Sequence, residues 1–329
     1  MKLHGRSVLV TGAGGFIGSH LVERLVECGC QVRGLVRYNS RSDYGLLEDI
    51  PQGHKEKVAV IAGDLRDAGA VRKAVAGVDM IFHLGSLIAI PYSYIHPEEV
   101  IETNVMGTLN VMLAAKEHGV SKVVHTSTSE VYGTALYVPI DEKHPLQGQS
   151  PYSASKIGAD KIVESFHGSF ELPVTTIRPF NTYGPRQSAR AVIPTIITQA
   201  LTQPAVHLGA VTPTRDFTYV SDIVEAFIRI AECDDVIGRT FNVGSSLEIS
   251  IGGLAGRIMG LLGKEIEVVQ HDDRLRPEKS EVQRLWADNT LAQRTFGWRP
   301  SVSLEEGLQR TIAWVSAHLD RYKIGTYGI

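Results

Sequence analysis

The chain has 329 residues, of which 43% are hydrophobic and 21% charged, and its formal net charge is −3. This length allows a substantial buried core in one large or two closely packed domains, and the charge balance argues against a nucleic-acid-binding protein. No apolar run approaches the ~20 residues that span a bilayer, and three cysteines are too few for a disulfide framework, so we expect a cytoplasmic protein with no membrane partner.

Short apolar segments alternate with helical segments over the first half of the chain. Strands that alternate with helices form parallel sheets covered on both faces, so this pattern predicts an α/β fold with a doubly wound parallel sheet. After about residue 178, prolines and glycines interrupt the pattern, and we expect residues 179–329 to form mainly a smaller C-terminal substrate-binding lobe. Residues of about 215–235 would return to the first domain, 1–178. The expected strands are 7–10, 31–36, 58–62, 80–84, 122–125 and 174–178.

A glycine-rich turn follows the first expected strand, in the sequence TGAGGFIG (11–18). Gly12, Gly15 and Gly18 keep a GxxGxxG spacing, which allows a tight turn and a close approach of the backbone to a pyrophosphate. The N-terminus of the next helix, with Phe16 and Ile17, would then face the negative charge. Because the motif lies between a strand and a helix, it predicts a dinucleotide site in a Rossmann-type domain.

The ends of the second and third expected strands bear on the cofactor. An acid at the end of the second strand usually selects NAD, but this position is Val36, and Arg37 follows it. Arginine binds a 2′-phosphate well, so the sequence slightly favours NADP, with NAD as the alternative. Asp64 and Leu65 follow the third strand, where an adenine would lie, although Asp64 could instead cap a helix.

Two further motifs carry polar groups suited to catalysis. Tyr152 and Lys156 are four residues apart after Ser150-Pro151, which reads as a helix start, so they should share one helical face. The lysine ammonium and a nicotinamide cation would lower the pKa of the tyrosine towards neutrality, where it can act as a base. At the end of the fifth strand, the sequence TSTSEVYG (126–133) adds the hydroxyls of Thr128 and Ser129 and the carboxylate of Glu130. Each motif alone could consist of ordinary exposed polar residues, and Glu130 could be a helix-capping or salt-bridged surface acid.

Together these motifs resemble the extended short-chain dehydrogenase/reductase superfamily, over nearly the whole chain. Segments 178–186, 215–220 and 296–300 resemble it as well. The resemblance implies a nucleotide-sugar enzyme in which Thr128 and Tyr152 act on the carbon-4 hydroxyl of the sugar and Lys156 holds the nicotinamide ribose. Family 4-epimerases need only these groups, whereas the dehydratases add a carboxylate. In the dehydratases this carboxylate belongs to a Thr-(Asp/Ser)-Glu triplet. Thr128-Ser129-Glu130 matches the triplet, most closely in the form found in the GDP-mannose 4,6-dehydratases, which implies a lyase.

Longer segments narrow the resemblance. The sequences HLGSLIAIPYSY (83–94), 126–156 and 178–201 are similar to the NDP-N-acetylglucosamine 4,6-dehydratases of legionaminic acid biosynthesis, a route to cell-surface polysaccharide. The alternatives are a UDP-sugar 4-epimerase, a UDP-glucuronate decarboxylase, whose family also carries Thr-Ser-Glu, or a protein that senses the dinucleotide or acts as a scaffold without catalysis.

The resemblance also implies substrate contacts and a partner. Asn181 and Arg215 match positions that hold the diphosphate or ribose, and Arg276 matches a second diphosphate arginine, although each arginine could be a solvated charge. Ser86 belongs to the loop that should line the sugar pocket. We expect a homodimer formed by the helices around 98–118 and 152–170. No metal site is expected, because Cys28-Gly-Cys30 has no other clustered ligands.

Overall fold

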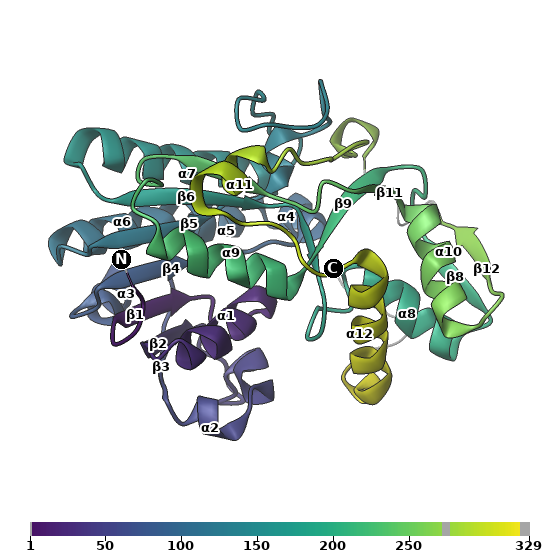
Figure 1. Ribbon diagram of the computed structural model, residues 1–329, viewed down its shortest axis with the longest axis horizontal. Helices are drawn as coiled ribbons and strands as arrows, with labels where there is room; N and C mark the ends of the chain where they lie inside the picture. Colours follow the sequence, from purple (N-terminus) through teal and green to yellow (C-terminus); the bar gives the residue numbers. More distant parts are fainter. Residues whose placement is uncertain (1, 272–276, 323–329) are drawn as a thin grey trace.

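The computed structural model describes residues 2–271 and 277–322 (Figure 1). Its centre is a seven-stranded parallel sheet with the strand order β10-β6-β5-β4-β1-β2-β3, which confirms the predicted fold class. The direction of winding reverses between β1 and β4, the position where doubly wound sheets open a crevice for ligands. The strands are β1 (Ser7–Thr11), β2 (Gln31–Val36), β3 (Val58–Ala62), β4 (Met80–His83), β5 (Lys122–Thr126), β6 (Val174–Pro179) and β10 (Thr240–Val243).

Helices cover both faces of this sheet (Figure 1). On β1, Val8 and Val10 pack into one hydrophobic cluster with α1 (Phe16–Glu27) and α9 (Val220–Glu232). Leu9 points the other way, as alternation along a strand requires, into a cluster with the helices of the opposite face. Burial on both faces explains why the strands are almost continuously apolar. The helices of the opposite face are α3 (Ala68–Val75), α6 (Gly107–Glu117) and α7 (Pro151–Phe170).

Short elements connect these strands and helices. Two short α-helices and a π-helical turn lead from β4 to α6, and a 3₁₀ turn follows β5. These elements are η1 (Gly45–Asp49), α2 (Gln52–Lys55), α4 (Ile90–Ile95), α5 (Pro97–Ile101), η2 (Glu102–Met106) and η3 (Ser129–Tyr132).

The second half of the chain builds a smaller group of elements beside the carboxyl end of the sheet (Figure 1). It contains a three-stranded sheet in the order β11-β9-β7 and a parallel pair, β12 and β8. Between β9 and β11 the chain returns to the main sheet as α9 and β10, and β10 pairs with β6. The elements are β7 (Asn181–Tyr183), α8 (Val192–Thr202), β8 (Ala205–Leu208), β9 (Thr214–Tyr219), β11 (Glu248–Ser250), α10 (Ile251–Leu262), β12 (Glu267–Gln270), η5 (Glu278–Ser280), α11 (Thr290–Phe296), α12 (Leu304–Ala317) and η6 (Leu319–Arg321).

The C-terminal segment is fastened to the main sheet by buried contacts. Trp298 is fully buried, and its indole Nε1 donates to the backbone oxygen of Asp222 on α9 at 2.8 Å. The Asp222 carboxylate in turn accepts from Ser301 and from the backbone of Val302. Among the described residues, no helix is both long and apolar enough to cross a membrane.

Candidate active site

The glycine-rich turn forms a tight cradle in which two positions, Gly12 and Gly18, have no room for a side chain. Gly12 has φ +70°, and a Cβ there would lie 2.8 Å from the backbone nitrogen of Gly85. A Cβ on Gly18 would lie 2.1 Å from the Gly12 oxygen. Helix α1 then begins after Gly15 without a side-chain cap, so its first N–H groups are left for a ligand. A close backbone approach beside an open helix N-terminus fits the pyrophosphate of a dinucleotide.

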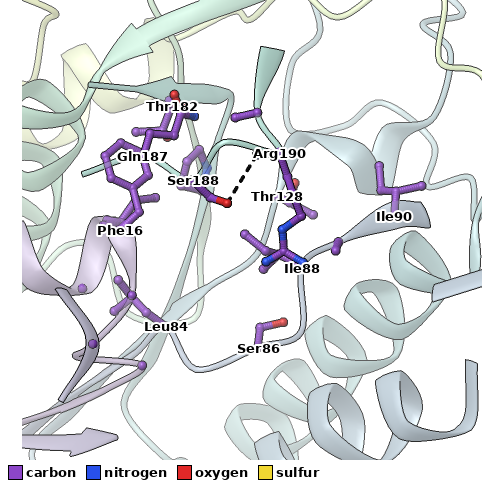
Figure 2. A pocket seen from close by; sticks show the side chains of 18 of the residues that line it. Phe16, Leu84, Ser86, Ile88, Ile90, Thr128, Thr182, Gln187, Ser188 and Arg190 are labelled. Carbon is purple, nitrogen blue, oxygen red and sulfur yellow. Dashed lines mark hydrogen bonds between the residues drawn. The ribbon is translucent and has the colours of Figure 1, made fainter. Parts of the chain in front are cut away.

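A cavity of about 720 Å³ opens from this turn along the carboxyl end of the sheet. Phe16 and Leu84 line one side of it, and Ile88 and Ile90 lie across from them (Figure 2). The cavity has the size and the mixed apolar and polar lining of a small-molecule site. Of the residues expected from the sequence, it brings together Gly12, Gly15, Phe16, Ile17, Gly18, Arg37, Ser86, Thr128, Ser129, Glu130, Tyr152, Lys156 and Asn181.

Two helix starts position the candidate catalytic side chains. Thr128 caps η3, and its Oγ1 accepts from the backbone nitrogen of Glu130 at 3.2 Å, so both side chains lie at the end of β5. Helix α7 begins with a reciprocal capping box, in which Ser150 and Ser153 each bond the backbone of the other. Tyr152 therefore lies in the first turn of α7 with its side chain buried at the cavity.

Lys156 lies one helical turn further along α7. Its Nζ donates to the backbone oxygen of Thr126 at 2.8 Å, and its side chain is only 4% exposed. Burial lowers the pKa of Lys156 to about 8, and the charge of Asp160 opposes this change. Lys156 is therefore mostly protonated at neutral pH, but its pKa lies close to that pH.

The protein's own residues raise the pKa of Tyr152, whereas the lowering expected from the sequence depended in part on the charge of a bound nicotinamide. Burial disfavours the phenolate, and the charges of Glu130 and Asp160 add to this effect, whereas a hydrogen bond with Thr128 acts in the opposite direction. The expected lowering relied on two cations, the Lys156 ammonium and a bound nicotinamide, and did not include the cost of burial. Tyr152 is therefore a neutral hydroxyl near neutral pH, and positive charge beside it would favour its action as a base.

A buried polar network lies beneath the catalytic residues. Asp160, one turn after Lys156, has one carboxylate oxygen 3.2 Å from His125 Nε2, while the other accepts from Ser127 and from Arg178 at 2.9 and 2.8 Å. Burial alone would raise the pKa of Asp160, but the hydrogen bond with His125 and the charge of Arg178 outweigh it and lower the pKa to about 2. This network joins α7 to β5 and β6 directly below the cavity.

Asn104 fixes the loop that carries Ser86. It lies fully buried in the π-helical turn η2, and its Oδ1 accepts from the Ser86 hydroxyl and from the backbone of Leu87, both at 2.8 Å. Its Nδ2 donates to the Leu87 oxygen and to the hydroxyl of Ser155 on α7. One side chain therefore ties the cavity loop to the helix that carries Tyr152 and Lys156.

Several cavity residues were not found from the sequence. The loop after β7 contributes Gln187, Ser188 and Arg190, and Figure 2 shows Gln187 beside Thr182 and Arg190 near Thr128. The only signal in the sequence was a polar run after Gly184-Pro185, which is also typical of an ordinary surface loop. Other polar cavity residues that were not predicted include Asn39, Asp43 and Tyr44 near the glycine turn and Thr195, Thr198 and Gln199 on α8.

Three polar atoms of the cavity wall are buried without a hydrogen-bond partner in the described part of the protein. They are Thr126 Oγ1, Asn181 Oδ1 and Gln187 Oε1. Leaving a buried polar group unsatisfied costs about 1–3 kcal/mol, so these atoms are suited to contact a polar ligand or water.

Four expected site residues are not among the cavity lining. Asp64 accepts a bidentate pair of bonds from Arg66, and Leu65 packs against Gly85 and Gly107. Arg215 on β9 is buried, and its guanidinium lies 3.3 Å from the Glu281 carboxylate. Arg276 lies outside the described residues. Their roles at the site remain predictions.

Comparison with known proteins places the chain in a family. The family model of GDP-mannose 4,6 dehydratase matches residues 9–311. The chain is 36% identical to a UDP-glucose 4-epimerase of Mycolicibacterium smegmatis, with 92% of this chain and 96% of that protein covered. It is 34% identical to a dTDP-glucose 4,6-dehydratase of Streptomyces griseus, with 94% of each covered.

A solved structure gives the same picture. The dTDP-glucose 4,6-dehydratase DesIV of Streptomyces venezuelae, solved with NAD and TYD bound, superimposes with a TM-score of 0.86 at 29% identity, over 96% of this chain and 99% of that one. The similar proteins thus include both dehydratases and epimerases. The chain belongs to the GDP-mannose 4,6-dehydratase family, within the extended short-chain dehydrogenase/reductases that act as nucleotide-sugar dehydratases and epimerases.

Proposed function

We propose that this protein is a nucleotide-sugar 4,6-dehydratase that converts an NDP-N-acetylhexosamine, NDP-N-acetylglucosamine by sequence resemblance, into its 4-keto-6-deoxy product. The observation that carries the proposal is the carboxylate of Glu130 on the wall of the same cavity as Tyr152, close enough for its charge to act on the pKa of that tyrosine. A 4-epimerase needs no such group, whereas elimination of water needs an acid and a base.

The residues can be assigned roles in this chemistry. A nicotinamide cofactor, when bound, supplies the acceptor for hydride from carbon 4 and the donor of hydride to carbon 6. Tyr152, hydrogen-bonded with Thr128, takes the proton of the carbon-4 hydroxyl, while the Lys156 ammonium favours the resulting phenolate. The ketone makes the carbon-5 proton acidic, and Glu130 removes it. The bond between carbon 6 and its oxygen then breaks, and Glu130 returns the proton to the departing hydroxyl, which leaves as water.

The cofactor proposal rests on the cradle around Gly12 and Gly18. It is supported by DesIV, which holds NAD. Arg37, directly after β2, lines the cavity and is the residue from which the sequence slightly favoured NADP.

A homodimer is part of the proposal. Ile101, Met106 and Leu113 are 41%, 48% and 47% exposed along the run from α5 to α6, and Phe170 at the end of α7 is 48% exposed. Helices α6 and α7 pack against each other, so these apolar side chains offer a joint surface that a second copy of the chain could cover.

The proposed reaction can be tested with substrate deuterated at carbon 4. We expect product that carries deuterium at carbon 6 and solvent hydrogen at carbon 5. A panel of UDP-, GDP- and dTDP-sugars, followed by mass spectrometry for loss of water, would identify the nucleotide and the carbon-2 substituent. A product isomeric with its substrate would instead support a 4-epimerase, the candidate that the Mycolicibacterium relative favours, and released carbon dioxide would indicate a decarboxylase.

Glu130→Gln should separate the half-reactions. Oxidation at carbon 4 does not need Glu130 and continues, but elimination loses its acid and base. We therefore expect reduced cofactor to accumulate, visible by absorbance, and turnover to fall roughly 10²–10⁴-fold. Glu164→Gln, an exposed acid on α7, is the matched control. Normal turnover in Glu130→Gln would show that the glutamate is only structural.

A further inference from the structure

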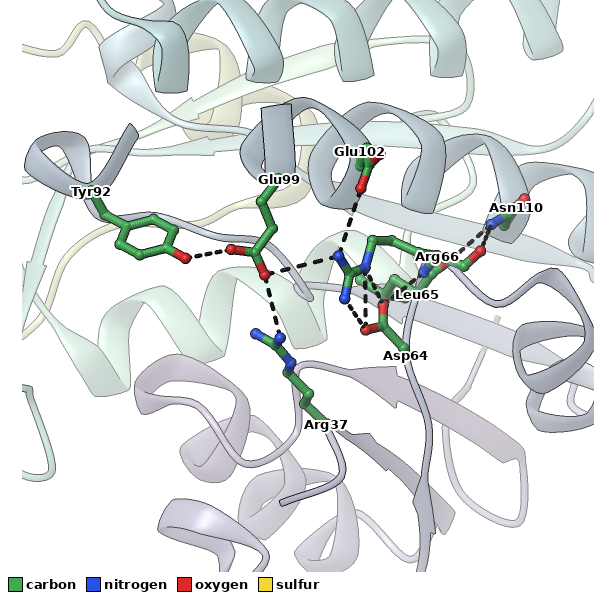
Figure 3. A network of polar contacts seen from close by, with 8 residues as sticks. All are labelled: Arg37, Asp64, Leu65, Arg66, Tyr92, Glu99, Glu102 and Asn110. Carbon is green, nitrogen blue, oxygen red and sulfur yellow. Dashed lines mark hydrogen bonds and ion pairs between the residues drawn. The ribbon is translucent and has the colours of Figure 1, made fainter. Parts of the chain in front are cut away.

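A cluster of charged side chains lies beside the end of β2 (Figure 3). Its members come from four separate parts of the chain: the end of β2, the turn after β3, helix α5 and η2. With two arginines and three carboxylates, its formal charge is −1. The charged members are Arg37, Asp64, Arg66, Glu99 and Glu102.

Glu99 is at the centre of this cluster. One of its oxygens lies 3.3 Å from Arg37 and 3.9 Å from Arg66. The other oxygen accepts from the hydroxyl of Tyr92 on α4. This hydrogen bond, followed by the charges of Arg37 and Arg66, lowers the pKa of Glu99 despite partial burial, so the carboxylate is ionised at neutral pH.

Arg66 is already neutralised by its neighbours. Its guanidinium donates two hydrogen bonds to the Asp64 carboxylate, at 3.1 Å from Nε and 2.7 Å from NH2. It also lies 3.6 Å from the Glu102 carboxylate. Arg37 is the cluster's member on the cavity wall, and Glu99 is its ion-pair partner. The one cation of the cluster that faces the ligand site therefore has a counter-charge inside the protein.

The strength of the Arg37–Glu99 pair is not what matters most. The Arg37 side chain is 62% exposed, and an exposed ion pair is worth only about 0–1 kcal/mol, so Arg37 could turn towards a ligand at little cost. Glu99 is 24% exposed and is held by Tyr92. Its carboxylate therefore stays beside the end of β2 whatever Arg37 does.

We propose that Glu99 selects NAD over NADP by keeping negative charge beside the end of β2, next to Arg37. The inference rests on the proposed function, in which the cavity binds a nicotinamide dinucleotide whose adenosine ribose lies at this strand end, as in dinucleotide folds generally. NADP would add a 2′-phosphate of about two negative charges to a cluster whose charge is already negative. NAD presents only a neutral hydroxyl. Glu99, 62 residues after Arg37, thus takes the place of the acid that β2 lacks.

The test is a binding titration without sugar substrate, followed by fluorescence. Purified protein freed of bound dinucleotide is titrated with NADH and with NADPH. The wild type should bind NADH more tightly, by about tenfold or more. Glu99→Gln keeps the shape and a partner for Tyr92 but removes the charge, and the ratio should move towards NADPH by roughly 10–100-fold, the range for a charge-assisted hydrogen bond to phosphate.

Two further variants make the result specific. In Arg37→Met/Glu99→Gln the gain in NADPH affinity should disappear, because Arg37 provides the phosphate contact. Glu98→Gln, an exposed acid on the same helix, should leave the ratio unchanged. A wild type that prefers NADPH, or a ratio unmoved in a folded Glu99→Gln, would overturn the role of Glu99 while leaving the dehydratase proposal intact. Binding of neither dinucleotide would overturn both.

Discussion

Asp160 should hold the charge on Lys156, and Asp160→Asn tests this. The two residues are one turn apart on α7, and both are buried. Lys156, whose Nζ donates to the Thr126 oxygen, must be protonated to favour the tyrosinate. Activity should therefore fall as pH rises through the pKa of Lys156, which is about 8. Loss of the Asp160 charge would lower this pKa, so the alkaline limb of the pH profile should move to lower pH.

The size of the shift can be bounded from Coulomb's law. At an effective dielectric constant of about 20, two unit charges about 6 Å apart interact by roughly 3 kcal/mol, or about two pKa units. Asp160 also interacts with Arg178 and His125, which weakens its effect on Lys156. We expect a shift of about one unit.

The assay is kcat/KM of the dehydration as a function of pH, with thermal unfolding measured in parallel. Asp160→Asn leaves the Arg178 charge buried without its partner, which costs about 3–5 kcal/mol, so a lower melting temperature is expected too. Tyr132→Phe is the control, because it breaks a bond of the same network to Arg178 but leaves every charge in place. An equal shift in that variant, or none in a folded Asp160→Asn, would refute the electrostatic reasoning.

Two further predictions concern the cofactor cradle and the dimer. Gly18→Ala should weaken dinucleotide binding at least about tenfold, because its Cβ would lie 2.1 Å from the Gly12 oxygen; Gly256→Ala, an exposed helical glycine with open space around it, is the control, and unchanged binding in Gly18→Ala would contradict the cradle. Met106→Glu, with a charge on the apolar surface of the helix that leads into α6, should turn the dimer into a monomer by light scattering, and a wild type that is already monomeric at micromolar concentration would rule the dimer out.

The main sheet could be predicted from the sequence because its strands are buried on both faces. All six expected strands are present, with ends that differ by at most one residue. The strand β10 was missed. Its four residues, Thr240–Val243, include two polar side chains, and only pairing with β6, more than sixty residues earlier, gives them a place in the sheet.

The candidate site could be predicted where its parts are local in the chain. The glycine turn, Thr128 to Glu130, and Tyr152 with Lys156 each depend on a single strand end or helix start, whose geometry is set by neighbouring residues. The pairing of Arg37 with Glu99 depends on how elements distant in the sequence pack together, so the local sequence around either residue could not predict it. The raised pKa of Tyr152 has a similar origin, because burial is a property of the assembled fold.

This difference has a consequence for function. The residues proposed for chemistry lie at the end of β5 and the start of α7, beside the main sheet, whereas Gln187, Arg190 and Gln199 come from a loop and a helix of the second half. Replacing side chains in that second half would change which nucleotide sugar fits without moving Tyr152 or Lys156. Epimerases and dehydratases can therefore share the same fold and the same oxidising residues. In the proposed reaction the carboxylate of Glu130 near Tyr152 separates a dehydratase from a 4-epimerase, so the Glu130→Gln variant is the most direct test of that assignment.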